Sequence, residues 1–279
     1  MPFADNGSVR LYYEIAGEPD LPVLVLVNGL GNQCIGFRDE MCRAFMDEGV
    51  RIVRIDNRDV GLSSSVQSEY SLSDMASDVI AVLDHAGVDR AHVMGFSLGG
   101  MIVQTLAIEH GHRLLTATSV MSTTGDPDVG HPSSEARELL LTPGATDRDA
   151  AVDAHLAGQR VWGSPGHVEW DVQADLAGRF FDRACRPEGV ARQYRAARRD
   201  KSRSDRLAGV RVPFLVLHGT ADTLIDVSGG RRTADVVPGA RLVEIDGMGH
   251  DYPRHFWPVL VGEFRAFALQ SRSDTEGES

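Results

Sequence analysis

The chain has 279 residues, of which 42% are hydrophobic, and a chain of this length can bury one large core together with an insertion. Its formal net charge of -12 disfavours nucleic acid and an anionic membrane as partners. No early apolar run is long enough for a signal peptide or a membrane span, so we expect a cytoplasmic protein.

The first part of the chain alternates between segments typical of strands and segments typical of helices. Residues 9–15 show the alternation of an edge strand, and residues 24–27 and 51–55 are expected to be interior strands. Between the last two, large apolar residues recur at every fourth position, as on one face of a helix: Phe37, Met41 and Phe45. Residues 71–87 combine a capping signal, an apolar stripe and a closing glycine. The alternation predicts an α/β fold, with a mostly parallel central sheet and helices on both faces.

Residues 95–99 read Gly-Phe-Ser-Leu-Gly and follow an apolar run, 91–94, that predicts a strand. Residues 101–108 then predict a buried helix. Gly-x-Ser-x-Gly between a strand and a helix is the sequence form of a nucleophile elbow. Alone, the pattern is more often a glycine-rich turn, but its flanking elements favour Ser97 as a nucleophile. The free N–H groups and the dipole of the helix N-terminus favour negative charge there.

Residues 125–205 separate a strand that ends near Met121 from one that begins near Val212. This segment has helical patterns without strand alternation, and it is far too long for a loop in a compact domain. We therefore expect a helical cap inserted over the active site. The flanking stretches then form the core and a polar, disordered tail: residues 1–124 and 206–270 for the core, and 271–279 for the tail.

An acid and a base follow the expected cap. Asp222 lies on the loop beyond an apolar run, 212–217, that predicts a buried parallel strand, and His250 lies on a glycine-rich turn. The chain order Ser, Asp, His is that of α/β-hydrolases. Serine alone is a weak nucleophile and needs a base such as His250 to remove its proton. Asp222 would fix the imidazole tautomer and stabilise its charged form.

Other polar residues near these loops are expected to be structural. Asp126 is the alternative acid, because some hydrolases place the acid after an earlier strand, and His218 is expected to be a structural hydrogen-bonding partner. Three aspartates are expected to be caps or solvated turn residues: Asp226, Asp246 and Asp251. No histidines have the spacing of metal ligands, and the three cysteines are scattered: Cys34, Cys42 and Cys185. We expect no metal, no disulfide and no organic cofactor.

Acyl transfer also needs donors for an oxyanion. Residues 28–31, Asn-Gly-Leu-Gly, follow the strand 24–27 and form the early strand-to-helix loop. In an α/β-hydrolase one donor is the backbone N–H of the residue after the nucleophile, here Leu98. The second comes from the early loop, and its position points to the backbone N–H of Leu30.

Together these segments resemble the α/β-hydrolase-fold serine esterases, most closely the aclacinomycin methylesterase-like subgroup and related bacterial lipases and esterases. The resemblance runs from about Leu11 to about Leu269, and five segments carry it: residues 28–31, 56–63, 95–100, 218–222 and 247–250. Many relatives have histidine where this chain has Asn28, and most have glycine where it has Asp59. Arg58 and Asp59 resemble a structural loop clamp. The resemblance implies the α/β-hydrolase fold, a helical cap and a small-molecule ester substrate.

The predicted reaction is cleavage of a carboxylic ester through an acyl-enzyme. The same triad also serves thioesterases, carbon–carbon hydrolases and cofactor-free perhydrolases of the haloperoxidase type, so these stay as alternatives. An alternative of another class is a small-molecule receptor built on a hydrolase fold. Ser97 argues against dehalogenases and epoxide hydrolases, which use a carboxylate nucleophile. The sequence leaves the oligomeric state and the identity of the ester open.

Overall fold

The computed structural model describes residues 2–142 and 144–276. One eight-stranded sheet forms its centre, with strand order β1-β2-β4-β3-β5-β6-β7-β8. The strands are β1 Phe3–Asn6, β2 Val9–Ala16, β3 Val23–Val27, β4 Arg51–Ile55, β5 Ala91–Phe96, β6 Leu114–Val120, β7 Phe214–Gly219 and β8 Arg241–Ile245. Strands β3 to β8 are parallel, whereas β1 and β2 pair antiparallel at one edge. The predicted α/β-hydrolase architecture is confirmed.

The first strand, β1, is not among the elements expected from the sequence. It pairs with β2 through a two-residue turn, since Asn6 lies opposite Val9. Gly7 begins that turn with φ of 61°, a left-handed conformation that glycine adopts without strain. The Asn6-Gly7 pair is a known hairpin signal, but the short strand before it has no clear apolar alternation.

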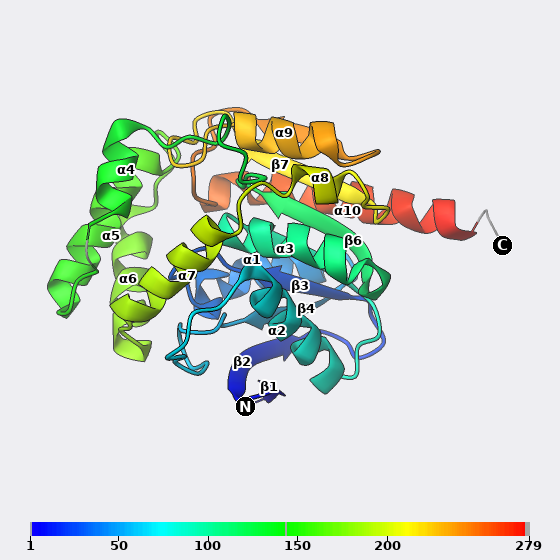
Figure 1. The fold of residues 1–279 in the computed structure, drawn as a ribbon, viewed down its shortest axis with the longest axis horizontal. Coiled ribbons are helices and arrows are strands. Elements are labelled where there is room, and N and C mark those ends of the chain that lie inside the picture. Colours follow the sequence, from blue (N-terminus) through cyan, green and yellow to red (C-terminus); the bar gives the residue numbers. More distant parts are fainter. Residues whose placement is uncertain (1, 143, 277–279) are drawn as a thin grey trace.

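Helices cover both faces of the sheet (Figure 1). Strand β3 shows why, because all five of its residues are buried and successive side chains point to opposite faces. Its valines join the core under α2 and α3, whereas Leu24 and Leu26 join the core under α1 and α10. The core helices are α1 Asp39–Met46, α2 Leu72–His85, α3 Leu98–Glu109, α9 Ser228–Val236 and α10 Trp257–Glu276. The described residues also form 3₁₀ turns at Cys34–Gly36, Gly111–Arg113 and Arg254–Phe256.

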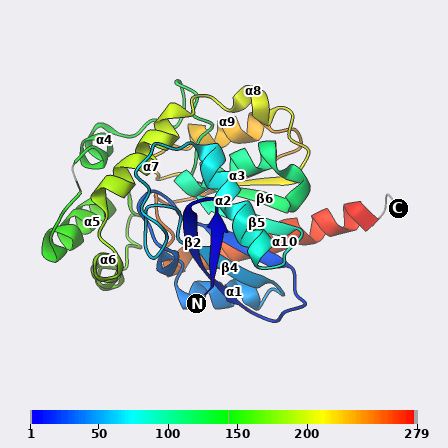
Figure 2. The ribbon, with the colours of Figure 1, turned by 60° about the horizontal axis from the view of Figure 1, so that its bottom comes forward.

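The described residues between β6 and β7 form helices and no strand. These helices are α4 Ser134–Leu140, α5 Arg148–Trp162, α6 Trp170–Arg183, α7 Pro187–Arg199 and α8 Ser204–Leu207. Ser133 and Asp147 cap α4 and α5 by accepting hydrogen bonds from backbone N–H groups of the first turn. Figures 1 and 2 both show α4 to α7 grouped on the side of the molecule away from the C-terminus. The division of the chain at residues 125–205 stays a prediction.

The last helix extends past residue 271, where the sequence predicts the start of a disordered tail. Helix α10 continues to Glu276, beyond Ser271, and residues 277–279 lie outside the described residues. Its earlier turns are anchored by buried Leu260, Phe264 and Phe267, and each further residue then adds one backbone hydrogen bond. The boundary of the tail at residue 271 stays a prediction. Among the described residues, no helix combines the length and apolar character that a membrane span needs.

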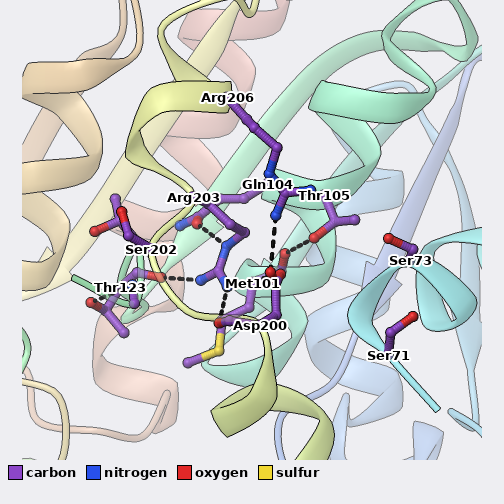
Figure 3. A network of polar contacts seen from close by, with 12 residues as sticks. Ser71, Ser73, Met101, Gln104, Thr105, Thr123, Asp200, Ser202, Arg203 and Arg206 are labelled. Carbon is purple, nitrogen blue, oxygen red and sulfur yellow. Dashed lines mark hydrogen bonds and ion pairs between the residues drawn. The ribbon is translucent and has the colours of Figure 1, made fainter. Parts of the chain in front are cut away.

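A fully buried arginine joins the end of the α4–α8 segment to the core (Figure 3). The guanidinium of Arg203 donates to Gln104 Oε1 on α3 at 3.0 Å and to the Thr123 carbonyl at 2.8 Å. It also pairs with Asp200 Oδ2 at 3.3 Å. Burial lowers the pKa of Arg203, because desolvation disfavours its charge. These contacts fix the point where the chain returns to the sheet.

Replacing Arg203 with Met should destabilise the protein, because Gln104 Oε1 and the Thr123 carbonyl would lose a buried donor. We expect the free energy of unfolding in urea to fall by about 3 kcal/mol. Arg206→Met is the matched control, since Arg206 is partly exposed and should change that free energy by less than about 1 kcal/mol. Equal losses in the two variants would contradict a special role for Arg203.

Candidate active site

Ser97 lies between β5 and α3 in a strained backbone conformation. Its φ of 56° and ψ of -117° are rare for a residue with a side chain. The flanking glycines make this turn possible. A Cβ at Gly95 would lie 2.0 Å from the Gly99 carbonyl oxygen, and a Cβ at Gly99 would lie 2.1 Å from the Val27 carbonyl oxygen. Only glycine fits at either position, so Gly-x-Ser-x-Gly forms the tight turn that the sequence predicts.

The structure brings Ser97, Asp222 and His250 together although they come from three distant segments. Asp222 follows β7 and His250 follows β8, so all three lie beyond the carboxyl ends of parallel strands. His250 Nε2 is 2.9 Å from Ser97 Oγ, and His250 Nδ1 is 2.7 Å from Asp222 Oδ2. An ionised carboxylate can only accept, so Nδ1 donates to Asp222 and Nε2 of the neutral ring accepts from the serine hydroxyl.

Asp222 is buried and held in its ionised form. Its Oδ1 accepts hydrogen bonds from the backbone N–H groups of Leu224 and Ile225, both at 2.9 Å. Burial by itself would raise the pKa of Asp222, but the positive charge that His250 carries when protonated and hydrogen bonds from His218 and His250 lower it to about 2. His218 also pairs with the Ile225 carbonyl at 2.8 Å, in agreement with the structural role expected for it.

The early loop lies directly against the nucleophile. A Cβ at Gly29 would be 3.2 Å from the Ser97 Cβ, so the loop backbone approaches Ser97 closely. Among the described residues, no hydrogen bond is made by the backbone N–H of Leu30 or of Leu98. Stabilising an oxyanion requires free N–H donors of this kind, one on each of the two elements that adjoin Ser97.

The side chain of Asn28 orients this loop. Its Nδ2 donates to the Gln33 carbonyl at 2.7 Å, and its Oδ1 accepts from the Tyr252 hydroxyl at 3.1 Å. Both the donor and the acceptor of the amide are used, so Asn28 connects the loop to Gln33 and to Tyr252. Asn28 is fully buried, which strengthens the requirement for these partners.

Asp126, the alternative acid, lies in a different cluster. Its Oδ2 accepts from the Ser204 hydroxyl at 2.6 Å and pairs with Arg232 at 2.6 Å, and Ser202 donates to its other oxygen. The structure therefore brings Asp222, and not Asp126, to the histidine. Asp226 accepts from backbone N–H groups of Ser228 and His131, as a turn residue does.

Asp251 is not the solvated turn residue that the sequence suggested. It is 5% exposed, and its Oδ1 accepts from the backbone N–H of Ser164 at 2.9 Å and from the Ser164 hydroxyl. Burial raises the pKa of Asp251. The Ser164 hydroxyl also accepts from the Gly249 N–H, and the His250 N–H donates to the Trp162 carbonyl at 2.6 Å. The end of α5 and the residues that follow it thus hold the loop that carries His250.

A small cavity of about 60 Å³ adjoins His250, and α5 and α6 form much of its wall. Its lining is mixed, with polar and apolar side chains: His155, Gln159, Gln173, Leu176, Phe180 and Tyr252. His155 Nε2 lies 2.8 Å from Gln173 Oε1, and burial lowers the pKa of His155. Within the described ranges, His, Cys, Asp and Glu side chains form no group of three or more that could hold a metal ion.

Arg58 and Asp59, in the loop that follows β4, each form a buried ion pair. Arg58 forms a buried pair with Asp78, with its Nε 2.6 Å from Oδ2. Asp59 pairs with Arg192 of α7 at 2.8 Å. Asp59 also has φ of 73°, a left-handed conformation that glycine would adopt without strain.

Comparison with known proteins identifies the family. A family model described as the alpha/beta hydrolase fold matches residues 22–252. The chain is 30% identical to rhodomycin D methylesterase DnrP of Streptomyces peucetius, over 89% of this chain and 91% of that protein. It is 28% identical to rhodomycin D methylesterase DauP of Streptomyces sp. (strain C5), over 88% and 90% of the two chains. The enol-lactonase structure from Burkholderia xenovorans LB400 superposes with a TM-score of 0.75 and 25% identity, covering 98% of this chain and 100% of that one.

The chain therefore belongs to the α/β-hydrolase fold family. The expected resemblance to esterases is confirmed, and at this coarse level so is the class of carboxylic ester hydrolase. The roles of individual residues remain to be argued from the site.

The low pKa of Asp222 links stability to pH. The folded protein favours the ionised carboxylate more than the unfolded chain does, so this contribution is present above about pH 4 and is lost as the pH falls toward 2. Between about pH 5 and about pH 2.5, wild type should lose up to about 2 kcal/mol more unfolding free energy than Asp222→Asn. Urea unfolding at the two pH values measures this difference. Identical pH dependence in both proteins would contradict a depressed pKa.

Proposed function

We propose that this protein cleaves a carboxylic ester with Ser97 as nucleophile, His250 as general base and Asp222 as the residue that orients the imidazole. The observation that carries the proposal is the continuous chain of hydrogen bonds, 2.9 Å from Ser97 Oγ to His250 and 2.7 Å from His250 to Asp222. The relatives named as methylesterases support an ester as substrate.

In the first step the Ser97 Oγ attacks the ester carbonyl carbon, and His250 Nε2 accepts the hydroxyl proton. The carbonyl oxygen gains negative charge and is stabilised by the N–H groups of Leu30 and Leu98. The tetrahedral intermediate then collapses, the bond to the alcohol oxygen breaks, and His250 returns the proton to the leaving alcohol. The product of this step is an acyl group on Ser97.

In the second step a water molecule attacks the acyl carbon, and His250 accepts one of its protons. The same two N–H groups stabilise the second oxyanion. Collapse of this intermediate breaks the bond to Ser97 Oγ, which regains its proton from His250, and the carboxylic acid is released. Asp222 stays ionised throughout, because it stabilises the imidazolium that forms twice in each cycle.

The segment 125–205 acts in this proposal as a cap that limits the substrate. Its helices α5 and α6 supply much of the wall of the cavity beside His250. Phe180 is the aromatic residue of the cap that reaches this wall, whereas Trp170 is exposed. A small cavity of mixed polarity favours a small or partly polar group next to the scissile bond.

Replacing Ser97 with Ala should reduce hydrolysis of a short-chain p-nitrophenyl ester to the rate measured without enzyme, because no nucleophile remains. A fluorophosphonate probe should label wild type and fail to label Ser97→Ala, as seen by intact-protein mass spectrometry. Labelling of the variant, or folded wild type that resists labelling, would contradict the assigned nucleophile. The second result would favour a receptor on a hydrolase fold.

Replacing Asp222 with Asn should lower kcat by about ten-thousandfold, because the imidazole would lose the acceptor that fixes its tautomer. The matched control is Asp126→Asn, which removes a carboxylate of the same type from a cluster without His250. The control should keep kcat within about threefold of wild type. Steady-state kinetics on the same ester measures both. A larger loss in Asp126→Asn than in Asp222→Asn would reassign the acid.

A further inference from the structure

A glutamine of α7 connects the loop after β3, which carries Leu30, to the loop after β4, which carries Arg58. The Gln193 side chain is fully buried. Its Oε1 accepts from the Gly31 backbone N–H at 3.0 Å, and its Nε2 donates to the Arg58 carbonyl at 2.8 Å. These two contacts span 162 and 135 residues of sequence. Because the donor and the acceptor are both used, the amide has one favourable orientation.

Contacts with the core hold helix α7 in place at this point, so the backbone that carries Gln193 is fixed. The neighbouring Arg192 forms a two-pronged, buried pair with Asp59, at 2.9 and 2.8 Å. On the same helix, Val190 packs against Gly31, where an added Cβ would lie 3.2 Å from its Cγ2. Gly31 has φ of 71°, which allows the loop to turn beneath the helix. The helix therefore contacts the loop through one apolar and one polar side chain.

The geometry of the loop shows how this contact reaches Leu30. Leu30 joins two planar peptide groups, and each plane has one anchor. The Gly29 carbonyl, in the same plane as the Leu30 N–H, accepts from the Asn32 N–H at 3.3 Å. The Gly31 N–H, in the next plane, is held by Gln193. With both planes fixed, the direction of the Leu30 N–H is fixed as well.

We propose that Gln193 is a positioning residue, which aims the Leu30 N–H at the oxyanion from the opposite side of the loop. This inference rests on the proposed function. Gln193 acts only through the backbone, so it should stabilise the transition state and leave ground-state binding of the ester unchanged. The cap would then contribute to the chemistry itself as well as to the choice of substrate.

Gln193→Met removes both hydrogen bonds and keeps a side chain of similar length. On a p-nitrophenyl ester, kcat should fall by about 10–100-fold with KM within about threefold, less than the loss of a whole oxyanion donor. A trifluoromethyl ketone forms a hemiketal oxyanion on serine, so its inhibition constant should rise by a similar factor. A purely structural role would lower the melting temperature without moving this constant.

Gln193→Glu is the second variant, because a carboxylate keeps an acceptor for the Gly31 N–H. Its inhibition constant for the ketone should lie between those of wild type and Gln193→Met. The matched control is Gln104→Met, which removes another fully buried glutamine, bound to Arg203 and away from the loop. Thermal unfolding of all three variants separates loss of stability from loss of oxyanion binding.

An unchanged inhibition constant in folded Gln193→Met would overturn the positioning role, and so would an equal rise in Gln104→Met. A raised KM with unchanged kcat would also overturn it. Wild type that cleaves the ester and binds the ketone establishes the proposed function independently of these variants. Wild type that does neither would contradict the proposed function and this inference together.

Discussion

The backbone of Ser97 is the constraint on which the rest of the site depends. A residue with a side chain at φ of 56° costs about 1–3 kcal/mol, and the surroundings must enforce it. They do so by hydrogen bonds on both sides of the residue: the Ser97 N–H donates to the Val120 carbonyl, and the Ser122 hydroxyl donates to the Ser97 carbonyl. The missing side chains at Gly95 and Gly99 then let the turn pack closely. Gly95 lies against the Gly99 carbonyl of α3, and Gly99 lies against the Val27 carbonyl at the end of β3. The hydroxyl is left pointing at His250.

Parallel strands bring the remaining groups to the same edge of the sheet. β7 delivers Asp222 and β8 delivers His250, while the loop after β3 lies against Ser97. Residues of the segment 125–205 form hydrogen bonds with the loops at this edge of the sheet. Residues 162–164 hold the histidine loop, and Gln193 holds the loop that carries Leu30. This helical segment thus shares hydrogen bonds with the rest of the chain at two of the elements that the proposed chemistry needs.

The features of the structure that adjacent residues encode can be predicted from the sequence. The elbow, the strands before Asp222 and His250 and the capping box at Ser71 are all written in adjacent residues, and the structure has them at those places. The roles of Asp251, Arg203 and Gln193 depend on partners that lie 80 or more residues away, so no local pattern signals them. Strand β1 was missed because its pairing with β2, more than its composition, decides that it forms.

A crystal structure of the protein inhibited by a p-nitrophenyl alkylphosphonate would test the central claim most directly. The account predicts phosphorus bonded to Ser97 Oγ and a phosphoryl oxygen about 2.7–3.1 Å from the backbone nitrogens of both Leu30 and Leu98. Phosphorus on any other side chain, or a phosphoryl oxygen directed to solvent away from both N–H groups, would contradict it.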